Sequence, residues 1–212
     1  MTINEALANL DRKTAVRVVL VNLIPVAGVL FLGWDTLEVL LAYWAETVVV
    51  GVAGLARVTT ARGEPVSLPG RLRLGGFFLL HYGLFCLIQA TLIVALTTQA
   101  GETVDVVART LGDEAFILAA ALIAGLQLVE LARDWWMSGL WRTSSPRRQM
   151  YQPYGRVAVV QIALIFGAGA LTMMGLPAGA VIVLCLAKAG LELFTSAQKR
   201  KDEAMVDEPL PK

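Results

Sequence analysis

The chain has 212 residues, of which 57% are hydrophobic and 17% are charged, and its formal net charge is +1. Soluble domains are closer to half apolar and a quarter charged, so this composition argues against an ordinary soluble domain. A net charge this close to zero gives no indication of a nucleic-acid partner. The apolar residues gather in long runs, which are typical of membrane-spanning helices.

Six of these runs are long enough to cross a bilayer, which takes about 20 apolar residues per helix. Short links predict tight antiparallel hairpins between the first two and between the last two helices. The sequence therefore predicts an all-α polytopic membrane protein, with one transmembrane domain over residues 1–198 and a charged, disordered tail over 199–212. The predicted spans are 14–34, 36–57, 74–98, 115–137, 156–176 and 178–198.

A short amphipathic helix is predicted in the link between the third and fourth spans. Val104, Val107 and Leu111 recur at helical spacing, and Asp105 and Arg109 alternate with them. We expect this helix to lie on the outer surface as a structural cover.

The positions of Lys and Arg predict the orientation. With six spans, four segments lie on the same side of the membrane: the N-terminal segment, the links after the second and fourth spans, and the C-terminal tail. These segments carry the Lys and Arg residues found in the links and at the chain ends. The opposite side holds only Arg109. Cytoplasmic loops are richer in Lys and Arg, so we expect a plasma-membrane protein with both termini in the cytoplasm.

Two ionisable residues, Glu46 and Lys188, fall near the middle of predicted spans. A charge at that depth costs roughly 2.5–3.5 kcal/mol on insertion scales, so such residues normally face the protein interior and pair. Lys188 has two candidate partners, Glu46 across the bundle and Glu192 one turn away. For both Glu46 and Lys188, a purely structural ion pair is the main alternative to a proton- or ligand-binding role.

Further polar residues lie in the cytoplasmic half of the predicted spans, whereas the outer half is mainly Leu, Val, Ala and Ile. This asymmetry predicts a polar pocket that opens to the cytoplasm, and it disfavours a wide pore. For His81, an interhelical hydrogen bond is the alternative to a proton relay or a metal ligand. The candidate substrate- or ion-binding residues are Glu46, His81, Glu130, Lys188 and Glu192.

No spacing typical of a metal site, a phosphate loop, a dinucleotide site or a serine elbow is present. We therefore expect no metal and no cofactor. Cys86 and Cys185 both lie in apolar runs, where they are expected to act as small packing residues rather than as a disulfide.

Several segments resemble a prokaryotic integral-membrane family of unknown function. The likeness rests on NLIPVAGVLFLGWDTLEVLLAYWAETVVVG, FFLLHYGLFC, YQPYGRVAVVQIALIFG and LAKAGLELF, in that order. It implies that Glu46, His81 and Lys188 belong to one site. The same pattern includes Tyr43, Tyr82 and Arg156. Together with Gln161, a polar residue of the fifth predicted span, they form the predicted supporting shell.

The chain departs from that pattern at Gln161 and in the TSAQ stretch, where relatives carry histidine, and at Glu192, where relatives carry aspartate. The resemblance therefore implies that a histidine-rich metal site of the relatives is degraded in this chain.

The favoured function is a small-solute or proton-linked carrier, or an accessory membrane protein, with the lipid bilayer as its environment and homodimerisation as a source of symmetry. No enzyme class is favoured. The first alternative is a membrane enzyme acting on a lipid-like substrate, in which His81 and Glu46 act as acid and base and Arg147, Arg148 and Arg156 hold an anionic head group. The second alternative is a non-catalytic scaffold or sensor.

Overall fold

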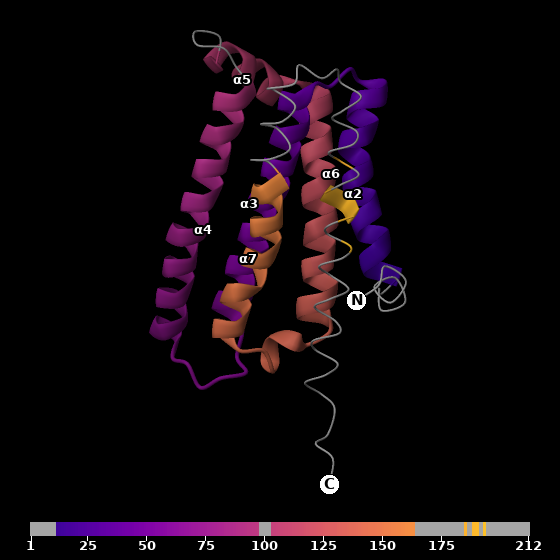
Figure 1. The fold of residues 1–212 in the computed structure, drawn as a ribbon. Helices are drawn as coiled ribbons and strands as arrows, with labels where there is room; N and C mark the ends of the chain where they lie inside the picture. Colours follow the sequence, from indigo (N-terminus) through magenta and orange to yellow (C-terminus); the bar gives the residue numbers. More distant parts are fainter. Residues whose placement is uncertain (1–11, 98–102, 164–184, 186–187, 191–192, 194–212) are drawn as a thin grey trace.

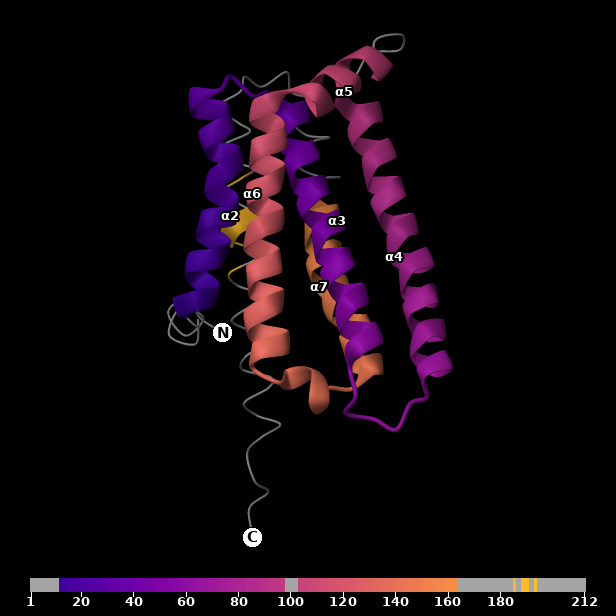
Figure 2. The ribbon, with the colours of Figure 1, turned by 180° about the vertical axis from the view of Figure 1, so that it is seen from behind.

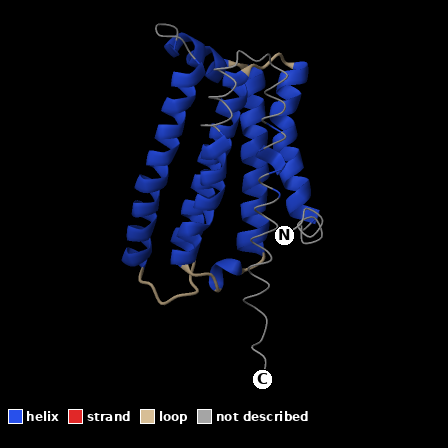
Figure 3. Ribbon diagram, in the orientation of Figure 1, coloured by secondary structure: helices blue, strands red, loops and turns tan. Residues whose placement is uncertain are grey.

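The computed structural model describes residues 12–97, 103–163, 185, 188–190 and 193. Within these residues every regular element is a helix (Figure 3). Three stretches, namely α3, α4 and α6 continued by η1, are long and apolar enough to cross a membrane. The elements are α2 (Arg12–Phe31), α3 (Thr36–Thr60), α4 (Leu68–Thr97), α5 (Thr103–Gly112), α6 (Glu114–Leu131), the π-helix η1 (Ala132–Met137), the 3₁₀-helix η2 (Leu140–Arg142) and α7 (Pro146–Ala163).

Helix α3 is the centre of the bundle. It contacts α2, α4, α6 and α7, which surround it in both side views (Figures 1 and 2). Small residues allow two of these contacts, because the ring of Tyr82 lies directly over Gly51, and Phe78 and Pro153 lie over Gly54.

The predicted positions of the first four long helices agree with the structure to within a few residues, except at the start of α4. This helix begins at Leu68 rather than at residue 74, because the Ser67 hydroxyl accepts a hydrogen bond from the Gly70 amide and starts the helix earlier. The first part of the fifth predicted helix lies in α7. Residues 164–176, most of the sixth predicted helix and the tail 199–212 lie outside the described residues.

A tight turn joins α2 to α3, as predicted. Gly33 adopts a φ of 70°, which lets the chain reverse between the helices. Asp35 then caps α3: its carboxylate accepts a hydrogen bond from the Leu37 amide at 2.7 Å, and its own amide donates to Glu38 at 3.0 Å. The Trp34 ring packs against Gly28 and Phe116, so it is buried between helices.

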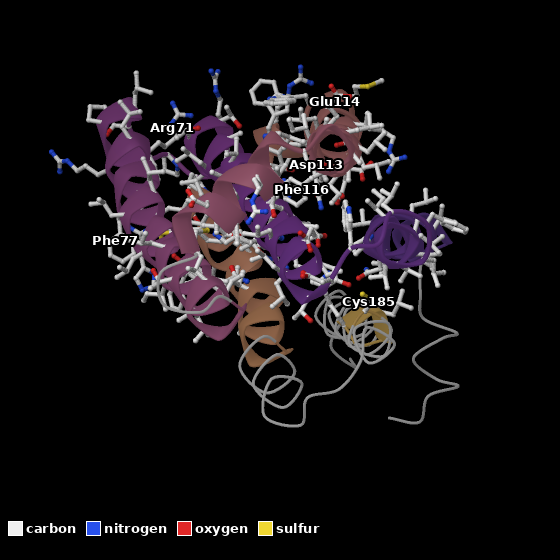
Figure 4. All side chains as sticks on the ribbon, turned by 90° about the horizontal axis from the view of Figure 1, so that it is seen from above. Arg71, Phe77, Asp113, Glu114, Phe116 and Cys185 are labelled. Atoms are coloured by element: carbon white, nitrogen blue, oxygen red, sulfur yellow. The ribbon has the colours of Figure 1, made fainter. Side chains whose placement is uncertain are left out.

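The predicted amphipathic helix is present as α5, across one end of the bundle (Figure 1). The Thr110 hydroxyl donates to Glu38 at the start of α3, at 3.2 Å. Asp113 then caps α6 by accepting a hydrogen bond from the Phe116 amide. Figure 4 shows Asp113, Glu114 and Phe116 close together at this corner. Helix α5 therefore ties the ends of α3 and α6 together.

The outer faces of α4 and α6 are apolar. Leu80 and Leu87 of α4 are 78% and 64% exposed, and Leu118 and Val129 of α6 are exposed to a similar degree. Helices that are apolar on all sides are typical of deep burial or of a lipid environment, and these two are largely exposed. Their surfaces therefore suit contact with lipid chains.

Candidate functional site

A buried ion pair connects the central helix to the C-terminal part of the chain. The Lys188 ammonium lies 3.0 Å from Oε2 of Glu46, and the two residues are 1% and 2% exposed. The described residues around Cys185 and Lys188 lie beside α2 and α3 (Figures 1 and 4). Of the two candidate partners of Lys188, Glu46 is the one joined to it in the described structure.

Two further groups hold the ammonium. Oδ1 of Asn22, on α2, accepts a hydrogen bond from Lys188 Nζ at 3.3 Å. The Tyr43 ring, one turn from Glu46 on α3, lies 4.3 Å from the same nitrogen, a distance suited to a cation–π interaction. Lys188 thus joins α2 and α3 through one charged group.

Hydrogen bonds fix the backbone next to Glu46. The Tyr82 hydroxyl of α4 donates to the Thr47 carbonyl at 2.8 Å, and the Thr47 hydroxyl donates to the Tyr43 carbonyl at 2.9 Å. One turn away, the Trp44 indole donates to the Cys86 carbonyl at 2.9 Å. These contacts set the rotation of α3 against α4, and so direct Glu46 toward Lys188.

The burial of this pair makes a purely stabilising role less favourable. Removing two charges from water costs several kcal/mol per ion, and close contact offsets that cost only when the remaining lone pairs and protons also find partners. Apolar residues of similar volume often serve stability equally well or better. The pair also differs from the exposed bridge between Arg133 and Asp134, whose side chains are both 48% exposed.

His81 lies in different surroundings. Its side chain is exposed on α4, its Nδ1 lies 2.8 Å from the Tyr154 hydroxyl of α7, and Phe77 and Phe85 flank its ring. None of its described contacts involves Glu46 or Lys188. The interhelical hydrogen bond expected as one alternative is therefore present, and a proton-handling role remains a prediction.

The other candidates are only partly described. Glu130 is half-buried on α6, one turn beyond the buried Gln127. The side chains of Gln161 and Arg156 and the whole of Glu192 lie outside the described residues. Tyr43 and Tyr82, which the family resemblance implied, both adjoin the ion pair or its backbone. Their supporting role remains a prediction.

Asn22 is the principal residue that the sequence reasoning missed. The available signal was an amide in an apolar run, one turn before Pro25. Its Nδ2 donates to the Val18 carbonyl at 2.8 Å, which orients Oδ1 toward Lys188. Gln89 was also missed; it is fully buried on α4, and its amide has no hydrogen-bond partner among the described residues.

Among the described residues, no three His, Cys, Asp or Glu side chains lie close enough together to bind a metal ion. Cys86 and Cys185 are buried free thiols. Cys185 packs with Tyr43 and Leu40 in the core between the helices, in agreement with its predicted packing role.

A polar cavity of about 620 Å³ lies at the end of the bundle that carries the α3–α4 link and η2. Its walls come from α3, η1, η2 and α7, and they include Arg57 and Arg148 but neither Glu46 nor Lys188. Arg57 follows Glu46 by about 16 Å along α3, at 1.5 Å per residue. The cavity and the ion pair are therefore separate features.

Together, these features describe a helical protein in which three of the described stretches are long and apolar enough to cross a membrane. Residues 5–208 match the family of unknown function DUF6498, and the chain belongs to that family. No curated protein and no solved structure matches the chain.

Proposed function

We propose that this protein spans the plasma membrane six times, with both termini in the cytoplasm. Three of the described helices meet the length and apolarity that a span requires. In addition, the start of α2, the α3–α4 link and the η1–η2 segment lie at one end of the bundle (Figures 1 and 2). These segments carry Arg12, Arg17, Arg62, Arg133 and Arg142, and cytoplasmic segments are typically rich in Lys and Arg.

Within that architecture the protein is a proton-linked carrier of a small solute, and the Glu46–Lys188 pair is its responsive centre. The supporting observation is the burial of the pair at 3.0 Å between α3 and the C-terminal segment. Ionisable groups at this depth commonly mark substrate and proton pathways.

The chemistry follows from the contacts. Transfer of one proton from Lys188 Nζ to Glu46 leaves two neutral groups and removes the attraction between them. A cation that binds Glu46, or an anion that binds Lys188, competes with the pair in the same way. Since Asn22 and Tyr43 also hold the ammonium, release of Lys188 would free α2 and α3 from the C-terminal segment together.

Proton flux into liposomes tests this proposal. The purified protein is reconstituted with an internal pH-sensitive dye, and a potassium gradient with valinomycin supplies the driving potential. We expect flux above that of protein-free liposomes, and at least a tenfold loss in the double variant Glu46→Gln/Lys188→Met. The matched control, Arg133→Gln/Asp134→Asn, removes an exposed pair and should retain the flux. Wild-type flux at the level of empty liposomes, or an unchanged flux in the double variant, would refute the proposal.

A structural scaffold is the second candidate, and it is favoured by the number of contacts to Lys188. An ammonium that meets a carboxylate, an amide oxygen and an aromatic ring suits a fixed connection between helices. The same experiment separates the two candidates, because a scaffold predicts equal behaviour of the wild type and the double variant. A lipid-modifying enzyme with His81 and Glu46 as acid and base has less support, because their described partners differ.

A further inference from the structure

His81 lies exposed on α4, within one of the stretches that are long and apolar enough to cross a membrane. The last charged residue before it on α4, Arg73, is about 12 Å away along the helix axis, at 1.5 Å per residue. After His81 the helix carries no charged residue up to its end at Thr97, about 24 Å further. In a membrane-spanning α4 this imidazole therefore lies well inside the hydrocarbon layer, which is about 30 Å thick.

An exposed imidazole at this depth is unusual. Ionisable residues within membrane spans almost always face the interior of the bundle or a water-filled cavity. Helix α4 packs mainly against α3 and α7 through a buried stripe that includes Phe78, Tyr82 and Cys86, and His81 lies beside this stripe. Lipid chains offer no hydrogen bond, and a polar group without one in apolar surroundings costs free energy. A ligand that combines an apolar body with a polar atom removes that cost.

One ring nitrogen of His81 is already held. Its Nδ1 lies 2.8 Å from the Tyr154 hydroxyl of α7, and this is the only hydrogen bond of the imidazole among the described residues. When the Tyr154 hydroxyl donates to Nδ1, Nε2 carries a hydrogen and can donate. When Nδ1 donates to the hydroxyl, Nε2 carries a lone pair and can accept. The open nitrogen therefore suits either a carbonyl oxygen or a hydroxyl group.

Two aromatic rings of α4 flank the imidazole. Phe77, labelled at the outer edge of the bundle in Figure 4, is stacked on it, with ring centroids 5.5 Å apart and planes at 15°. Phe85 meets it edge to face at 5.2 Å. Both phenyl rings are exposed, and planar rings favour stacked or edge-to-face contact with a further planar ring. The surface formed by Phe77, His81 and Phe85, here named the His81 surface, thus suits a flat ligand.

We propose that the His81 surface binds the ring of a lipid-soluble quinone. A quinone carbonyl accepts a hydrogen bond from Nε2, and a hydroxyl of the reduced quinol donates to Nε2 in the other tautomer. The ring packs on the two phenyl groups, and the hydrocarbon tail lies along the exposed Leu84 and Ile88. A phospholipid head group fits this surface poorly, because it would bring its charge into the hydrocarbon layer. The inference rests on the proposed passage of α4 through the membrane, and it does not require the carrier activity of the Glu46–Lys188 pair.

His81 is the only histidine of the chain, so its imidazole can be observed alone. The full-length protein in detergent, labelled with ¹⁵N in the histidine ring, is titrated with decylubiquinone, and with n-decylbenzene as the comparison that lacks carbonyl groups. We expect the Nε2 resonance to shift to saturation with the quinone, at a dissociation constant at least tenfold lower than that for n-decylbenzene. An Nε2 resonance that the quinone leaves in place, or equal affinity for the two probes, would overturn the proposal.

Variants connect that binding to the His81 surface. His81→Phe retains the aromatic packing and should weaken decylubiquinone binding at least tenfold, measured by calorimetry. Thr91→Val is the matched control, because Thr91 is exposed on the same helix and its hydroxyl already donates to the Leu87 carbonyl at 2.9 Å; its affinity should be unchanged. The Glu46→Gln/Lys188→Met variant should also bind normally, which separates this site from the carrier centre.

Two further results would contradict the quinone site. One is an equal affinity of the wild type and His81→Phe. The other is an Nε2 resonance that changes when the protein is diluted and not when quinone is added, because a second copy of the chain would then cover the His81 surface. Each result leaves the proton-flux test of the carrier unaffected, since that test depends on Glu46 and Lys188.

Discussion

The Lys188 ammonium and the Glu46 carboxylate form an ion pair at 3.0 Å although 142 positions of sequence separate them. The pair brings the C-terminal part of the chain against the central helix. Both residues lie in apolar runs and are almost fully buried. Their contact therefore limits how the helices that carry them can move.

The two members of this pair should be strongly coupled in stability. Glu46→Gln or Lys188→Met alone leaves the other charge buried without its partner, and we expect each to lower the free energy of unfolding by about 3–5 kcal/mol. The double variant removes both charges and should recover most of that loss. Denaturant titration of all four proteins in detergent gives the coupling energy. Additive losses in the double variant would contradict the contact.

Close packing of α4 on α3 predicts a sharp difference between two glycines. A methyl group at Gly51 would overlap the Tyr82 ring, so Gly51→Ala should destabilise the protein by about 1–3 kcal/mol. It should also disturb the hydrogen bond from Tyr82 to the Thr47 carbonyl. Gly83→Ala is the control, because nothing lies within 4 Å of the added carbon. That control should be neutral or more stable by about 0.5–1 kcal/mol, in accordance with helix propensity. Equal Tm values for the two variants would contradict this packing.

His81 is expected to be dispensable for the ion-pair centre. Its described partners are Tyr154, Phe77 and Phe85, and its side chain is exposed. His81→Phe loses one hydrogen bond and retains the aromatic packing, so a loss of about 0.5–1.5 kcal/mol in stability is expected. Proton flux in liposomes should remain at the wild-type level. A tenfold fall in flux with an unchanged Tm would instead place His81 on the same pathway as Glu46.

The proposed orientation can be tested by cysteine labelling in cells. In a chain with Cys86 and Cys185 replaced by alanine, Arg109→Cys on α5 should react with a membrane-impermeant maleimide added from outside. Arg147→Cys, at the opposite end of the bundle, should react only after the membrane is made permeable. Both positions are exposed, so access to the reagent depends on the side of the membrane. Labelling of Arg147→Cys in intact cells would reverse the orientation.

Local features of the fold could be predicted from the sequence because they depend on residues that are close together along the chain. Apolar length predicted the long helices, and the link GWDT predicted the turn that Gly33 and Asp35 form. The spacing of Val104, Val107 and Leu111 predicted the cover helix α5. The start of α4 was predicted six residues too late, because apolar length carries no information about the cap at Ser67.

Apolar length and charge by themselves determined that this is a helical protein with buried ionisable groups, because a long apolar run that carries a charge has few stable arrangements. Only the tertiary structure decided which groups meet. It joined Lys188 to Glu46, Asn22 and Tyr43, and it left His81 with Tyr154. The reason is that these contacts depend on the rotation of each helix about its axis. That rotation is set by packing between helices, such as the contact of the Tyr82 ring with Gly51. Such packing depends on two helices at once, so the sequence of one span does not predict it.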